Sequence, residues 1–147
     1  MRLLVINGPN LNLLGKRQPE VYGTLSLEQI EARLARRAGE LGVDLSPLQA
    51  NDEGVIVDFL QREAEGADGV IINPGALTHY GLSLRDALEA THLPIVEVHI
   101  SNIYSREEFR RHSVIADIAL GQITGLGWRG YIAALETLVR MLREKDE

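Results

Sequence analysis

Residues 3–10 read Leu-Leu-Val-Ile-Asn-Gly-Pro-Asn, four apolar residues followed by residues that favour turns. A short apolar run that stops this abruptly predicts a strand buried on both faces, as in a parallel sheet. Residues 11–22 continue without helical or alternating periodicity and carry the polar side chains of Arg17 and Tyr22. A loop of this length in a compact domain is usually a lid or a binding loop, and the plain alternative is an ordinary surface loop.

The rest of the chain alternates between segments patterned as strands and segments patterned as helices. After residues 3–6, strands are predicted over residues 43–49, 68–73, 95–99 and 115–123. Helices are predicted over residues 27–41, 52–65, 83–91, 106–111 and 131–145. Ser26 and Gln29 have the spacing of a capping box for the first of these helices. Asn51 is the expected cap of the second, and Gly66 its expected end.

This alternation predicts an α/β fold in which helices cover both faces of a parallel sheet. Right-handed crossovers leave few ways to connect such elements. Pro47 suits an edge strand because proline has no N–H to donate to a neighbour. We therefore expect a flavodoxin-like three-layer sandwich with a five-stranded parallel sheet of order 2-1-3-4-5.

The composition is typical of a soluble globular protein, with 24% charged and 45% hydrophobic residues. A chain of 147 residues predicts one domain over residues 1–147. The net charge of −6 argues against a nucleic-acid surface, and no apolar run approaches the roughly eighteen residues that span a membrane. Met1 leads into the first strand without a signal-peptide pattern, so a cytoplasmic location is expected. Cysteine is absent and the histidines show no close-spaced pair, so no metal site is expected.

Polar side chains gather where three of the predicted strands end. They occupy residues 7–22, 73–80 and 99–102, after the first, third and fourth strands. In an open parallel sheet, ligands bind beyond the carboxyl ends of the strands, at the point where the strand order reverses. The three segments are therefore predicted to form one crevice between the first and third strands.

Glu97 and His99 are the strongest local signal, because a strand covered on both faces is normally apolar throughout. A buried carboxylate without a partner is too costly to persist. Residues two apart on a strand point to the same side, so His99 is the nearest candidate partner. A carboxylate beside an imidazole orients the ring and makes it a candidate general acid. The alternatives are a purely structural Glu–His pair and an ion pair between Glu97 and Arg106.

Two other patterns have simpler explanations. Gly125, Gly127 and Gly130 match the spacing of a dinucleotide-binding fingerprint, but the chain that follows is too short for the next strand and its ribose-binding acid. A tight turn explains these glycines equally well. The arginines within residues 106–111 are either a local anion-binding group or a solvated basic helix face.

Four segments together resemble one known family. They are residues 4–17 (Leu-Val-Ile-Asn-Gly-Pro-Asn-Leu-Asn-Leu-Leu-Gly-Lys-Arg) with Val-Tyr-Gly at 21–23, Asn-Pro-Gly-Ala-Leu-Thr-His at 73–79, Glu-Val-His-Ile-Ser-Asn at 97–102, and Arg-Glu-Glu-Phe-Arg at 106–110. In this order they resemble type II 3-dehydroquinate dehydratases over nearly the whole chain. The resemblance implies a flavodoxin-like fold and a dehydration in the shikimate pathway without a cofactor. It also implies a small anionic substrate and a homododecamer built of four trimers.

The resemblance also implies roles for individual residues. Tyr22 resembles the base that removes a proton beside the ketone, and Arg17 the group that holds this tyrosine as a phenolate. His99 resembles the acid that protonates the departing hydroxyl, Glu97 the residue that orients it, and Asn10 the residue that positions a water at the enolate oxygen. The substrate-binding set corresponds to Asn73, His79, Ile100, Ser101 and Arg110, with Asp86 reaching into the site of a neighbouring subunit.

The sequence departs from the family pattern at Leu77 and at Tyr80-Gly81, which leaves the finer shape of the substrate pocket open. Two other classes share the expected fold. A flavin- or nucleotide-binding module would need a hydroxyl-rich phosphate loop after the first strand, and a signalling receiver would need aspartates there and at the end of the third strand. This chain has Asn7 and Asn73 at those positions.

Overall fold

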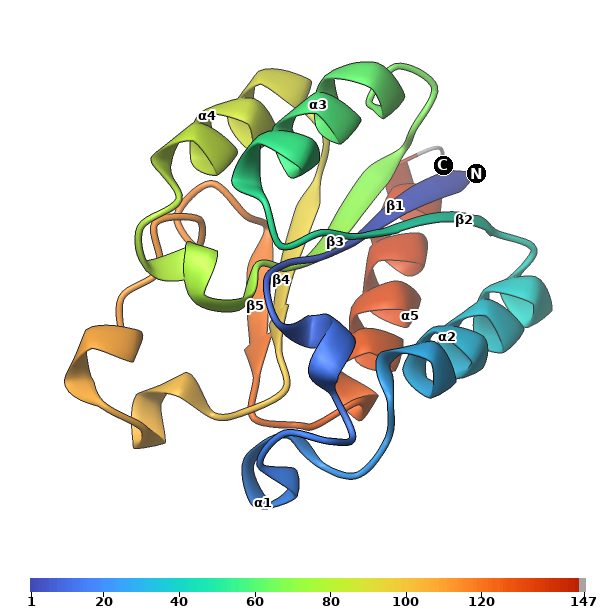
Figure 1. Ribbon diagram of the computed structural model, residues 1–147. Coiled ribbons are helices and arrows are strands. Elements are labelled where there is room, and N and C mark those ends of the chain that lie inside the picture. Colours follow the sequence, from blue (N-terminus) through green and yellow to red (C-terminus); the bar gives the residue numbers. More distant parts are fainter. Residues whose placement is uncertain (146–147) are drawn as a thin grey trace.

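A computed structural model describes residues 1–145 and contains one five-stranded sheet. Every neighbouring pair is parallel and the order is β2-β1-β3-β4-β5, as predicted (Figure 1). Pro47 lies in β2 at the edge of the sheet, opposite Val5. The strands are β1 (Arg2–Asn7), β2 (Asp44–Gln49), β3 (Gly69–Asn73), β4 (Ile95–His99) and β5 (Gly121–Thr124).

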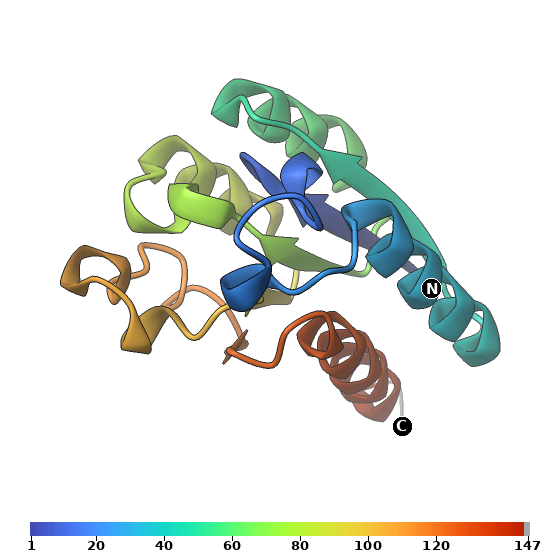
Figure 2. The ribbon, with the colours of Figure 1, turned by 60° about the horizontal axis from the view of Figure 1, so that its bottom comes forward.

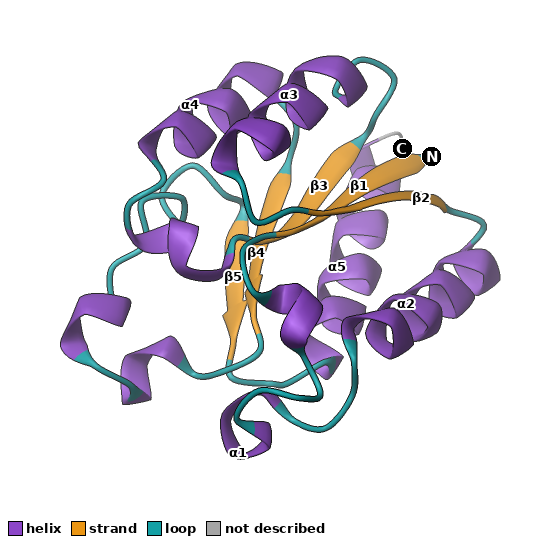
Figure 3. Ribbon diagram, in the orientation of Figure 1, coloured by secondary structure: helices purple, strands orange, loops and turns teal. Residues whose placement is uncertain are grey.

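Helices cover both faces of the sheet and complete a three-layer α/β sandwich (Figure 3). On one face lie α2 (Leu27–Leu41) and α5 (Arg129–Lys145); on the other lie α3 (Glu53–Glu63) and α4 (Leu82–Thr91). A single turn of helix, α1 (Pro19–Tyr22), stands apart at the end toward which the strands point. Within residues 1–145, no helix is both long enough and apolar enough to span a bilayer.

The strand β1 divides the interior into two cores. Leu3 and Val5 pack with α2 and α5, whereas Leu4 and Ile6 pack with α3 and α4. The division follows from the strand geometry, since successive side chains point to opposite faces. All four side chains are almost fully buried, and burial of each contributes about 1.5–3 kcal/mol to folding. The apolar run at residues 3–6 is therefore the centre of both cores.

The helix ends follow the sequence with two corrections, both at α3. This helix ends at Glu63 with Ala64 as its C-cap, so Gly66 lies beyond its end. Ser26 and Gln29 form the predicted capping box, and Gly42 ends α2 in the left-handed conformation. The cap of α3 is Asp52 and not Asn51, because the Asp52 carboxylate accepts a 2.7 Å hydrogen bond from the Gly54 N–H. Asn51 instead accepts the N–H of Asn10, so its side chain is already engaged.

Two further predicted elements were wrong in extent. The fifth strand covers only Gly121–Thr124, because the predicted segment begins in a turn in which the Ser113 hydroxyl accepts the N–H groups of Ile115 and Ala116. The predicted helix over residues 106–111 is replaced by two short 3-10 turns, Ile103–Ser105 and Glu108–Arg110. Ile115 is fully buried in the second core, so its apolar character reflects packing and not strand pairing.

Candidate active site

A cavity of about 240 Å³ lies at the carboxyl ends of β1, β3 and β4. The chain leaves β1 toward α2 on one face and leaves β3 toward α4 on the other, so the two connections separate and form a crevice. Figure 2 views the molecule from this end, with α1 and the loops after the strands toward the reader. Of the residues assigned by resemblance, the cavity is lined by Asn10, Arg17, Tyr22, Asn73, His79, His99, Ile100, Ser101 and Arg110.

Gly8 allows the loop after β1 and the loop after β3 to approach each other closely. Its N–H donates to the Asn73 carbonyl at 2.8 Å, and a Cβ at this position would lie 2.3 Å from the Pro74 carbonyl oxygen. Any side chain here would therefore push the two loops apart. Gly8 thus helps to end the strand and also keeps together the two loops that line the cavity.

Glu97 and His99 form the predicted pair at the end of β4. His99 Nε2 lies 2.7 Å from Glu97 Oε2, and both side chains are buried. The alternative pairing of Glu97 with Arg106 is wrong, because the Arg106 guanidinium bonds the Ser101 hydroxyl at 3.3 Å. With Nε2 held by the carboxylate, Nδ1 is the His99 ring nitrogen that remains for a ligand in the cavity.

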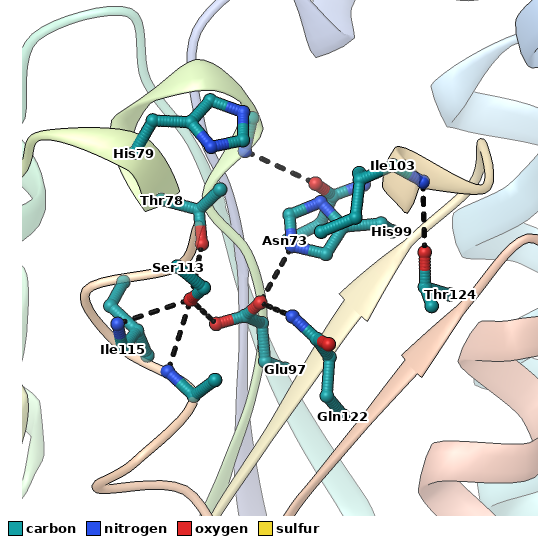
Figure 4. A network of polar contacts seen from close by, with 12 residues as sticks. Asn73, Thr78, His79, Glu97, His99, Ile103, Ser113, Ile115, Gln122 and Thr124 are labelled. Carbon is teal, nitrogen blue, oxygen red and sulfur yellow. Dashed lines mark hydrogen bonds and ion pairs between the residues drawn. The ribbon is translucent and has the colours of Figure 1, made fainter. Parts of the chain in front are cut away.

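Two residues that the sequence analysis did not identify complete the environment of Glu97. The Ser113 hydroxyl donates to Glu97 Oε1 at 2.6 Å, and the Gln122 amide donates to Oε2 (Figure 4). Burial alone raises the pKa of Glu97, but the hydrogen bonds from His99, Ser113 and Gln122 outweigh it, so the pKa lies below its ordinary value. Glu97 is therefore a buried, ionised and fully bonded carboxylate.

Tyr22 lies at the mouth of the cavity with two guanidinium groups over its ring. Arg17 Cζ is 5.0 Å and Arg106 Cζ is 5.3 Å from the ring centroid. Both distances are in the range of cation–π contacts. The sequence analysis considered Arg106 as part of a basic cluster and as an alternative partner of Glu97, and here it lines the cavity beside Tyr22.

The remaining polar groups of the cavity are held by the loops after β1 and β3. Asn10 has a left-handed backbone (φ 69°), and its N–H donates to Asn51 Oδ1 at 3.0 Å. His79 Nδ1 lies 2.8 Å from the His112 carbonyl oxygen. Burial is the main reason that the pKa of His79 lies below its ordinary value, and the neighbouring charges of His99 and Arg110 add to this shift. A neutral His79 that donates through Nδ1 leaves Nε2 as a hydrogen-bond acceptor.

Comparisons with known proteins identify the family. Residues 1–139 match the family described as Dehydroquinase class II. A 3-dehydroquinate dehydratase from Roseiflexus castenholzii is 61% identical over 139 residues, which cover 95% of this chain and 88% of the relative. The chain belongs to the class II dehydroquinase family. The match confirms the resemblance on which the residue roles were based.

A second relative and a solved structure agree with this family. A 3-dehydroquinate dehydratase from Halothermothrix orenii is 56% identical over 143 residues, which cover 97% of each chain. The crystal structure of a type II dehydroquinase from Butyrivibrio crossotus superposes with a TM-score of 0.92 at 44% identity, covering 94% of this chain and 97% of that one. The flavodoxin-like fold predicted from the sequence is therefore the dehydroquinase fold.

Within this dehydroquinase fold, Asp86 is the assigned residue that lies apart from the cavity. It is exposed on α4, and the cavity lining does not include it. Glu97 also does not line the cavity, because it lies behind His99. The subunit by itself thus brings together every assigned residue except Asp86.

The glycine motif near the carboxyl end of the chain serves a tight turn between β5 and α5. Gly125 and Gly127 have positive φ angles of 90° and 62°, and their N–H groups donate to the carbonyls of His99 and Ile100. A Cβ on Gly125 would lie 2.9 Å from Asn102 Cβ. The turn thus packs against the segment after β4 that carries the cavity residues. Among residues 1–145, no group of three or more potential ligands could hold a metal ion.

Proposed function

We propose that this class II dehydroquinase removes water from 3-dehydroquinate to give 3-dehydroshikimate through an enolate intermediate, with no cofactor. The observation that carries this proposal is that two candidate proton-transfer groups line one cavity. They are Tyr22, with two guanidinium groups over its ring, and His99, which is held by Glu97 at the end of β4. The curated relatives that carry the name 3-dehydroquinate dehydratase support the choice of substrate.

The first step that we propose is removal of the proton from the carbon next to the ketone by the Tyr22 phenolate. Arg17 and Arg106 stabilise that phenolate, because two positive charges lie within about 5 Å of its ring. The electrons of the broken C–H bond move to the ketone oxygen and form an enolate. A water positioned by Asn10 donates a hydrogen bond to this oxygen, which places a donor where negative charge develops.

The second step is loss of the hydroxyl group, with His99 as the general acid. In this step His99 starts as an imidazolium: its Nε2–H stays with Glu97, the Nδ1 proton moves to the departing oxygen, the enolate collapses to the conjugated ketone, and water leaves a neutral His99 behind. Glu97 keeps the ring in place through its 2.7 Å contact with Nε2 and remains ionised throughout. Ser113 and Gln122 in turn fix the carboxylate from the far side.

An anionic, hydroxyl-rich substrate suits the remaining groups of the cavity. We assign the grip on its carboxylate to Ile100 and Ser101, which follow directly after the acid at the end of β4. Asn73, His79 and Arg110 are assigned to its other polar groups. The cluster of arginines around the mouth adds positive charge that attracts such a substrate to an otherwise acidic protein.

The proposal extends to the assembly. Asp86 is exposed on α4 and away from the cavity of its own subunit, which fits a residue that completes the site of a neighbour. We propose a homododecamer of four trimers, one catalytic domain per chain over residues 1–147, and a cytoplasmic location. The assembly is tested by sedimentation, together with mixing of Asp86→Ala and Tyr22→Phe subunits. Recovery of activity on mixing is expected, and a fully active monomer would overturn this part of the proposal.

The activity itself is tested with purified protein and 3-dehydroquinate in an ultraviolet assay. The product contains a conjugated enone, so absorbance is expected to rise with wild-type protein and to stay flat with Tyr22→Phe. Wild-type protein that produces no enone would contradict the proposed function. Copurifying flavin absorbance in its place would favour the alternative of a flavin-binding module with this fold.

A further inference from the structure

Tyr131 is a buried phenol for which the proposed reaction has no use. It lies in the first turn of α5, is 1% exposed, and reaches across to the ends of two strands. Its hydroxyl lies 2.6 Å from Asn7 Oδ1 at the end of β1 and 2.9 Å from Asn73 Nδ2 at the end of β3. One side chain thus joins a helix to two central strands at the edge of the cavity.

The direction of these hydrogen bonds is fixed by a backbone group. The N–H of Gly75 can only donate, and it lies 3.1 Å from Asn73 Oδ1. The Asn73 amide must therefore place Nδ2 toward Tyr131, so the phenol oxygen accepts from Asn73. The single hydrogen of Tyr131 is then free to be donated to Asn7 Oδ1. Reversing the chain would set the Gly75 N–H against the Asn73 NH₂ group, two donors facing each other.

Burial reinforces this direction, because it raises the pKa of Tyr131 far above its ordinary value. The raised pKa favours the protonated phenol, whose hydrogen is donated to Asn7 Oδ1. The arrangement has a cost, since Asn7 Nδ2 is buried without a partner among the described residues.

The Asn73 amide is thus held at both ends. Its oxygen accepts from Gly75, one of its two N–H groups donates to Tyr131, and the side chain lines the cavity while being only 3% exposed. A primary amide has two N–H donors. The second N–H has no partner within residues 1–145, so it is the donor that Asn73 can offer to a ligand in the cavity.

We infer that Tyr131 is a positioning residue that locks the Asn73 amide so that its free N–H faces the substrate, where it selects an oxygen acceptor such as a hydroxyl. This inference rests on the proposed function, because it concerns how the same site binds its substrate. Without the Tyr131 hydroxyl, the amide keeps only the Gly75 contact and turns more freely about its last torsion. The loss then falls on substrate binding and not on the proton transfers of Tyr22 and His99.

The test is a double-mutant cycle in the enone assay with Tyr131→Phe, Asn73→Ala and the double variant. Tyr131→Phe removes one oxygen atom and keeps the ring, so KM is expected to rise roughly threefold to tenfold, the value of one hydrogen bond. The kcat is expected to change by less than about threefold. In the Asn73→Ala background, Tyr131→Phe should have no further effect on KM, because its only route to the substrate is gone.

Leu135→Val is the matched control, since it removes a buried methylene one turn further along α5 and carries no polar group. It should lower thermal stability while leaving KM unchanged. If Tyr131→Phe raises KM equally in both backgrounds, or only lowers stability as Leu135→Val does, Tyr131 is a packing residue and the inference is wrong. Wild-type protein without dehydratase activity would instead refute the proposed function, so the two failures are distinct.

A second variant keeps the inference testable if Tyr131→Phe does not fold. Asn7→Leu removes the acceptor of the Tyr131 hydroxyl from the other side and also removes the unpaired Asn7 N–H. The phenol hydrogen then turns toward Asn73, where it faces the N–H that Asn73 donates to Tyr131. Two donors facing each other weaken this contact. The same rise in KM, absent in the Asn73→Ala background, is expected. An unchanged KM for Asn7→Leu would contradict the inference.

Discussion

His99 Nε2 and Glu97 Oε2 lie 2.7 Å apart at the end of β4, with both side chains buried. The ring is held at one nitrogen by an ionised carboxylate, and its other nitrogen is left for the cavity. Ser113 and Gln122 bond the same carboxylate, so the acid is positioned by two layers of contacts.

Glu97 is expected to make folding stability depend on pH. Its pKa in the folded protein lies below the ordinary value of 4.5, so its contribution is fully present above that value and is lost as the pH falls through the folded pKa. Denaturant unfolding between pH 3 and 7 should show a steeper loss of stability below about pH 4.5 for wild-type protein than for Glu97→Gln. Identical pH slopes for the two proteins would show that folding does not lower the pKa of Glu97.

Ser113 is predicted to matter for stability more than its place in a loop suggests. Its hydroxyl donates to Glu97 and accepts the N–H groups of Ile115 and Ala116. Ser113→Ala leaves these groups unpaired and should cost about 1–3 kcal/mol of unfolding free energy. The control is Ser105→Ala, an exposed serine, for which a change within about 0.5 kcal/mol is expected. Equal losses for the two variants would mean that the Ser113 network adds nothing to stability.

Arg17 is predicted to act on catalysis through Tyr22. Arg17→Ala removes one of the two guanidinium groups that stabilise the phenolate, and kcat should fall by at least about tenfold, as expected for loss of a partly buried charge contact. Arg33→Ala is a suitable control because Arg33 stacks in the same way on Trp128, on the outside of the molecule. The enone assay should show full activity for this control. Full activity of Arg17→Ala would show that Arg17 only packs within the loop and does not act on Tyr22.

No covalent imine between substrate and protein is expected. Such a mechanism needs a lysine in the cavity, and the sequence contains only Lys16 and Lys145. Lys16 is exposed and does not line the cavity, while Lys145 lies beside Met1 and Asp68 at the opposite end of the sheet. Borohydride added with substrate should leave activity intact, and Lys16→Met should keep most of its turnover. A substrate-derived mass adduct on Lys16 after reduction would overturn the enolate mechanism.

Much of the fold could be predicted because its signals are local. The apolar run at residues 3–6 is long enough for one strand and too short for a helix, and Pro47 can be tolerated only at an edge. The fifth strand could not be bounded, since Ile115 is apolar for packing reasons and only residues that face β4 become strand. The cap of α3 was missed by one residue because Asn51 and Asp52 are both good caps, and only the fold shows that Asn51 is engaged by Asn10.

The candidate site, like the fold, could be predicted only where its signals are local in the sequence. Glu97 could be identified because it is a carboxylate in an otherwise apolar strand. Its partner, His99, followed from strand geometry, because residues two apart point to the same side. Gln122 gave no such signal. It bonds Glu97 because the two residues are opposite each other in the β4–β5 register, which depends on where β5 begins. Tyr131 is further still in sequence from Asn7 and Asn73, so its contact with both exists only once the helix has packed.

In the proposed mechanism Tyr22 forms the enolate and His99 completes the elimination, and deuterium exchange separates these two roles. Each variant is incubated with 3-dehydroquinate in deuterated water, and the label on the carbon beside the ketone is followed by mass spectrometry against a protein-free control. His99→Asn keeps the base and lacks the acid, so it should exchange this proton without releasing water. Tyr22→Phe should do neither. Exchange by Tyr22→Phe, or its absence in folded His99→Asn, would contradict the account.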